Sequence, residues 1–225
     1  MATATAETGA VGGERHFVLD GIDYDGYVAI NDAIGEGRNV RVVYVDGRVT
    51  FLTASRRHEW LSRRLAELVK AVASATGIRW EDAGSATFRS RDHAVGVEGD
   101  ETFYLGEHAE LMRGSINIDL SSQPPPDIAI EVEVSHPADD ALLVYGRLGV
   151  PEVWRFDVED WTFSFCLRCE DGSYRSSNRG LALPWLETKD VLDQLRLAEA
   201  LGADEWSIQL REWVRTTIVP RMTEG

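Results

Sequence analysis

Three acidic side chains, interrupted by the small residue Ala129, occupy alternate positions after the prolines that end at Pro126. Asp127, Glu131 and Glu133 share one face of the strand expected there, because side chains alternate across a strand. The other face is β-branched and apolar, as a core requires, and carries Ile128, Ile130, Val132 and Val134. Neighbouring carboxylates repel one another and lose solvation when buried, and a divalent cation would relieve both costs. The alternative is an edge strand with a solvated acidic face.

Two residues outside this strand could join its acids. Asp100 follows Gly99 where a turn enters a short aromatic strand, a suitable place for an acid from a second strand, although aspartate after glycine is also ordinary turn chemistry. His58 lies on the apolar stripe of a helix that Ser55 can cap. It is either a packed, hydrogen-bonded histidine or a metal ligand or proton carrier at the mouth of a cleft.

The elements around these residues alternate between strands and helices. The acidic strand, a helix over 139–148 and a strand over 153–156 form a unit typical of parallel or mixed sheets with a cleft at one edge. An Asp-Gly turn at Asp46 between two apolar runs predicts a hairpin. Residues 91–98 and 107–114 are expected to be loops or turns. The last third is predicted to be helical, over 189–201 and 205–218. The fold class is therefore α/β (α+β).

Composition predicts a single domain over 16–225, preceded by a disordered tail over 1–15. No apolar run is long enough to span a bilayer, and the N-terminus lacks the pattern of a signal peptide, so we expect a cytoplasmic protein without a membrane partner. The net charge of −15 opposes nonspecific binding to nucleic acid. A local basic patch could offset it, although such a cluster is more often a solvated helix face; it comprises Arg56, Arg57, Arg63 and Arg64.

Several segments, taken in order, resemble the Uma-type family of restriction endonucleases, bacterial relatives of the PD-(D/E)xK nucleases. They are Val43 to Val49, His58, Gly99 to Tyr104, Pro125 to Glu133, Tyr145, and Gly149 to Arg155. The resemblance covers roughly Val40 to Arg215, and the Pro-Pro-Asp-(x)3-Glu and Gly-Val-Pro-Glu-Val-Trp segments are its most specific parts.

The resemblance implies a restriction-endonuclease-like mixed β-sheet of roughly four or five strands flanked by helices, with an N-terminal β-hairpin and C-terminal helices. It implies magnesium- or manganese-dependent phosphodiester cleavage. Asp100 and Glu131 would hold the metal together with Asp127 or Glu133, and His58 would assist at the rim. The catalytic candidates are thus Asp100, Glu131, Glu133 and His58, and the metal candidates are Asp100, Glu131 and Asp127.

The sequence lacks the lysine of the family pattern. Glu133 stands where the acid-x-lysine motif usually has lysine, and Ala141 stands at the alternative lysine position on the following helix. Arg147 lies about 240° further round that helix and faces elsewhere. Two hypotheses remain: a metal-dependent endonuclease acting on nucleic acid, DNA rather than RNA, or a noncatalytic interaction module on the same fold. A homodimer would suit the first, because many such nucleases cut both strands as dimers.

Overall fold

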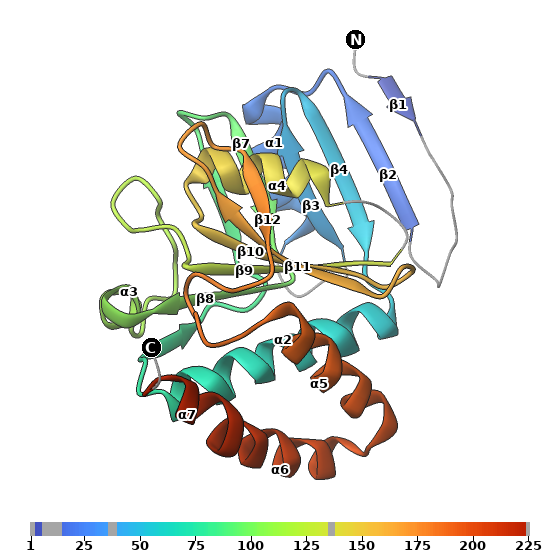
Figure 1. Ribbon diagram of the computed structural model, residues 1–225. Coiled ribbons are helices and arrows are strands. Elements are labelled where there is room, and N and C mark those ends of the chain that lie inside the picture. The colour runs from blue at the N-terminus through green and yellow to red at the C-terminus, as the bar shows by residue number, and fades with distance from the viewer. Residues whose placement is uncertain (1–2, 6–14, 36–39, 135–137, 224–225) are drawn as a thin grey trace.

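The computed structural model describes residues 3–5, 15–35, 40–134 and 138–223. Within these residues the strands form two six-stranded sheets, and helix α4 (Asp139–Leu148) packs against both of them (Figure 1). Helix α1 (Tyr24–Ile34) covers the outer face of the first sheet. Helices α2 (Arg56–Ala75), α5 (Thr188–Ala200) and α6 (Ala203–Trp213) cover the outer face of the second.

The first sheet is antiparallel throughout and has the order β1-β2-β4-β3-β7-β6. Its strands are β1 (Thr3–Thr5), β2 (Arg15–Asp20), β3 (Arg41–Val45), β4 (Arg48–Thr53), β6 (Thr87–Ser90) and β7 (Val95–Glu98). The predicted hairpin is confirmed as β3 and β4. Asp46 and Gly47 at its turn have φ of 51° and 82°, as a two-residue hairpin turn of this type requires.

The second sheet is mixed, as predicted, with the order β12-β11-β10-β9-β8-β5. Its strands are β5 (Trp80–Asp82), β8 (Glu101–Leu105), β9 (Ile128–Glu133), β10 (Glu152–Asp157), β11 (Thr162–Arg168) and β12 (Tyr174–Ser177). Strands β9 and β10 are its parallel pair, and α4 connects them. The implied four or five strands are an underestimate, since this sheet alone has six and a second sheet packs beside it.

The alternation predicted for the acidic strand is confirmed. Its apolar residues Ile128, Ile130, Val132 and Val134 pack into the core beneath α2, α5 and α6. Ala129, on the opposite face, packs toward α4 and the first sheet. The face of β9 that carries Glu131 and Glu133 is therefore turned toward α4 and the first sheet.

Two local predictions were wrong. Residues 91–98 include β7, whose short Val-Gly-Val core is recognisable only from its pairing with β3 and β6. Residues 107–114 include most of α3 (Gly106–Met112), a helix without a side-chain cap that buries Ala109 and Met112. In the expected tail, Thr3–Thr5 pairs with β2 and Arg15 begins β2, while 6–14 lies outside the described residues.

The C-terminal helices continue past α6 as a π-helical turn, η1 (Val214–Ile218), and α7 (Val219–Arg221). Helix α2 begins after Ser55, whose hydroxyl accepts a hydrogen bond from the His58 amide, as the capping pattern predicted. None of the helices in the described ranges combines the length and the apolar character that a membrane crossing needs.

Candidate functional site

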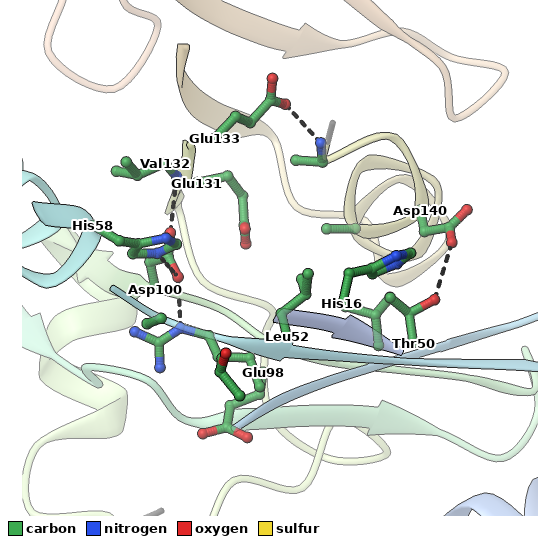
Figure 2. A pocket seen from close by; sticks show the side chains of 16 residues that line it. His16, Thr50, Leu52, His58, Glu98, Asp100, Glu131, Val132, Glu133 and Asp140 are labelled. Carbon is green, nitrogen blue, oxygen red and sulfur yellow. Dashed lines mark hydrogen bonds and ion pairs between the residues drawn. The ribbon is translucent and has the colours of Figure 1, made fainter. Parts of the chain in front are cut away.

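A small pocket of about 70 Å³ lies where the two sheets meet (Figure 2). The charged and titratable residues that line it are His16, Arg41, His58, Glu98, Asp100, Glu131, Glu133 and Asp140. They come from both sheets and from α2 and α4. Four predicted site residues, Asp100, Glu131, Glu133 and His58, thus line the same pocket.

Asp100 lies where the chain leaves β7 of one sheet and enters β8 of the other. Gly99 makes this crossing possible, because a Cβ there would lie 2.4 Å from the Tyr145 hydroxyl. Asp100 is 3% exposed. Its Oδ2 accepts a hydrogen bond from the Val132 amide at 2.8 Å, which ties it to β9 beside Glu131.

The other oxygen of Asp100 contacts two basic side chains. Arg41 Nε donates to Oδ1 at 2.6 Å, and His58 Nε2 lies 2.7 Å from the same oxygen. Burial raises the pKa of Asp100, but the charges and hydrogen bonds of His58 and Arg41 outweigh it, so the pKa is lowered overall. Asp100 is therefore an ionised carboxylate held in a fixed orientation.

Glu131 faces the same cavity from β9, and its carboxyl group keeps its proton to a higher pH than that of Asp100. Tyr145 Oη donates to Glu131 Oε1 at 2.6 Å. Burial and the charge of Asp100 raise the pKa of Glu131 to about 8, although Tyr145, Arg41 and His58 act in the opposite direction. Two neighbouring carboxyl groups whose pKa values are shifted in opposite directions are typical of a functional site.

The carboxylate of Glu133 is held by an arginine and a backbone amide. Arg155 of β10 contacts both of its oxygens, at 2.6 Å and 3.1 Å, and the Ala138 amide donates to Oε1 at 2.7 Å. Arg155 also lies 3.4 Å from Asp139. The carboxylate of Glu133 lines the pocket, but its charge is already balanced by an arginine.

The structure does not bring Asp127 to the pocket. Its Oδ2 accepts from the Leu105 amide at 2.6 Å, and its Oδ1 lies 2.9 Å from His108 Nδ1 of α3. Burial raises its pKa despite these contacts. Asp127 and Glu131 share a strand face, yet four residues of strand separate them by about 13 Å.

Sequence reasoning missed Arg41, Glu98 and His16, which also line the pocket. Glu98 ends β7, so recognition of that strand would have placed it near Asp100, two residues on. Arg41 begins a hairpin strand whose other residues are apolar, which gives no sign of a site. His16 lies on β2, which reaches the pocket only through the pairing of β2 with β4.

The pocket suits some metals better than others. Across the part of the chain that the structure describes, no group of three or more His, Cys, Asp or Glu side chains is arranged to hold a metal ion. Asp100 and Glu131 nevertheless converge, and magnesium is commonly bound by one or two carboxylates completed by water and phosphate oxygens. Asp100 and Glu131 are thus the two candidate ligands for a magnesium-type ion, which would take its remaining ligands from water and substrate.

Comparison with known proteins gives one informative match. No curated protein matches this sequence. The model of the family Uma2, described as "Putative restriction endonuclease", matches residues 25–200. The match spans α1 to α5 and includes Asp100, Glu131 and Glu133. Because it covers well over half of the chain, this protein belongs to the Uma2 family, a nuclease-like family of restriction endonuclease type.

Proposed function

We propose that the protein is a metal-dependent endonuclease that hydrolyses phosphodiester bonds in DNA. The observation that carries this proposal is the convergence of Asp100 and Glu131, from adjacent strands of the mixed sheet, in one pocket. Family membership supports the reaction class. The two carboxylates would also repel each other when both are ionised, and a bound divalent cation would remove that repulsion.

Asp100 and Glu131 would hold magnesium or manganese. When bound, such an ion supplies an activated water and a Lewis acid for the phosphate oxygens. The Val132 amide and Arg41 fix the orientation of Asp100, and the Tyr145 hydroxyl fixes that of Glu131. His58, beside Asp100 at the start of α2, is placed to accept or relay a proton.

The test is conversion of supercoiled plasmid to open-circular DNA with Mg²⁺ or Mn²⁺, with and without EDTA. The wild type should nick the plasmid, and EDTA should stop the reaction. Glu131→Gln and Asp100→Asn should each lower the rate by about 100-fold or more, as loss of a metal ligand does. Glu152→Gln is the matched control, since Glu152 is also a buried strand carboxylate but lies outside the pocket.

Two results would overturn the proposal. One is a folded wild-type protein that cleaves neither plasmid DNA nor single-stranded RNA with any of these metals. The other is cleavage that Glu131→Gln leaves unchanged, which would point to a contaminating nuclease. RNA cleavage in place of DNA cleavage would correct the substrate and keep the site. Gel filtration with light scattering would show whether the active species is a dimer.

A noncatalytic interaction module is the second candidate. It is favoured by the pairing of Glu133 with Arg155 and by the pairing of the basic face of α2 with acids. On that face Arg57 contacts Glu199 at 2.7 Å, and Arg64 contacts Glu67 at 2.7 Å. This candidate predicts no heat of Mn²⁺ binding by calorimetry and no metal-dependent cleavage of DNA or RNA, while Glu133→Gln should lower stability because it breaks the pair with Arg155.

A further inference from the structure

The pocket is strongly acidic for a site that would take a phosphodiester. Its lining carries five carboxylic acids, Glu98, Asp100, Glu131, Glu133 and Asp140. A phosphodiester is an anion, so its approach to this lining needs positive charge beyond that of a metal ion. Among the described residues that line the pocket, Arg41 is the only arginine or lysine.

We propose that Arg41 contacts the phosphate of the bound nucleic acid and offsets the charge that develops on it during cleavage. The inference rests on the proposed function and adds a catalytic residue to it. Arg41 is on β3, at the start of the hairpin strand, and its side chain is 10% exposed. It thus lies inside the pocket, where solvent screening is weak.

The contacts of Arg41 preset its orientation. Nε donates to Asp100 at 2.6 Å, and Nη2 donates to Glu59 of α2 at 2.9 Å. These two bonds engage only part of the donor fork of a guanidinium group, whose planar geometry suits bidentate binding of phosphate. A group held in place before substrate binds needs little reorganisation during the reaction.

The other nearby arginines are less suitable. Arg155 is bound by Glu133 and Asp139, and it lines a neighbouring cavity with Thr162 and Ser164. Arg147 is bound by Asp46 at the β3–β4 turn, with both contacts at 2.7 Å. Neither lines the pocket.

Arg41 would offset charge and not act as a base. An arginine guanidinium group keeps its proton at every working pH. The water proton must go to another group, and His58 lies beside the same Asp100 oxygen.

The experiment compares Arg41→Ala and Arg41→Lys with the control Arg147→Ala, which removes an arginine paired with Asp46 outside the pocket. Plasmid nicking is measured with Mn²⁺, and binding of a fluorescein-labelled DNA duplex is measured with Ca²⁺ in its place. Arg41→Ala should lower the nicking rate by about 100-fold and weaken duplex binding, as loss of a transition-state donor does. Arg147→Ala should stay within a few-fold of the wild type.

Chemical rescue separates a direct role from a structural one. Millimolar guanidinium or methylguanidinium added to Arg41→Ala should restore part of the nicking rate, and it should not stimulate the wild type or Arg147→Ala. A purely structural role predicts no rescue. Circular dichroism and thermal melting check the fold, and if Arg41→Ala is unfolded, Arg41→Lys carries the test: it should fold and lose nicking activity because it lacks the planar fork.

The inference and the proposed function can fail separately. Nicking by a folded Arg41→Ala or Arg41→Lys at the wild-type rate overturns the inference and leaves the nuclease standing. A wild type that does not nick DNA overturns the nuclease, and the Ca²⁺ binding assay still decides on Arg41. Equal duplex binding by wild type and folded Arg41 variants, or no binding by either, overturns the phosphate contact.

Discussion

Two buried carboxyl sites in this protein make an informative comparison. Glu152 on β10 is 0% exposed, and its oxygens accept hydrogen bonds from the Trp154 indole at 2.6 Å and from the Leu181 and Ala182 amides at 2.7 Å each. All these donors are neutral. In the pocket, by contrast, Asp100 contacts charged groups and faces a cavity.

The difference shows that burial alone does not mark a functional acid. Glu152 lies in the Gly-Val-Pro-Glu-Val-Trp segment and fastens the loop that carries Leu181 and Ala182 against the sheet. Glu152 therefore has a structural role in one of the most distinctive segments of the sequence. Asp100 and Glu131 are different because charged neighbours, as well as burial, shift the pKa of each, and because both line a pocket that a ligand can enter.

The largest expected effect is on stability when Asp100 loses its charge. Asp100→Asn leaves the buried Arg41 without its closest counter-charge, and breaking a buried pair in this way costs about 3–5 kcal/mol. Urea denaturation followed by tryptophan fluorescence measures the change. Retention of wild-type stability would mean that Glu59 alone satisfies Arg41 and that the pocket is less tightly coupled than its contacts imply.

A smaller loss is expected for Glu152→Gln. One oxygen is retained, but the new amide group meets either the Trp154 indole N–H or the backbone amides, and an unsatisfied buried donor costs about 1–3 kcal/mol. The plasmid-nicking rate of the folded variant should equal that of the wild type. A large loss of nicking without unfolding would contradict the structural role assigned to Glu152.

The pH dependence of the free energy of unfolding should also differ between the wild type and Glu152→Gln. Burial raises the pKa of Glu152 above its ordinary value of 4.5, although its hydrogen bonds oppose the shift. The folded state thus keeps the proton longer than the unfolded state, and the contribution of Glu152 to stability falls as pH rises from 4.5 toward its folded pKa. Denaturation curves between pH 4 and pH 7 should show that Glu152→Gln removes this component of the slope.

The smallest effect is expected for Tyr145→Phe, which removes the hydrogen bond to Glu131 without removing a charge. The loss of stability should be about 1 kcal/mol, the net value of such a bond. Nicking should fall because Glu131 is no longer oriented, and Mn²⁺ calorimetry would show whether metal affinity falls with it. Unchanged nicking would mean that the packing of β9 alone fixes Glu131.

Much of the local structure could be predicted from the sequence. The alternation along β9, the Asp-Gly hairpin, the Ser55 cap and the helix over 139–148 all depend on short-range patterns. The failures have different causes. Strand β7 is recognisable only through its partners, and the separation of Asp127 from Glu131 follows from distance along the strand, which a shared face does not reveal.

The amino-acid order by itself determined which residues alternate, where helices and turns begin, and which acids were available for a site, because these depend on neighbours within a few positions. Only the tertiary structure decided that β3 and β7 of one sheet would meet β8 and β9 of the other around a common pocket. That meeting places Arg41 against Asp100, 59 positions apart in the chain. Pairing across such separations is set by how the sheets and helices bury their apolar faces together, which no local pattern contains.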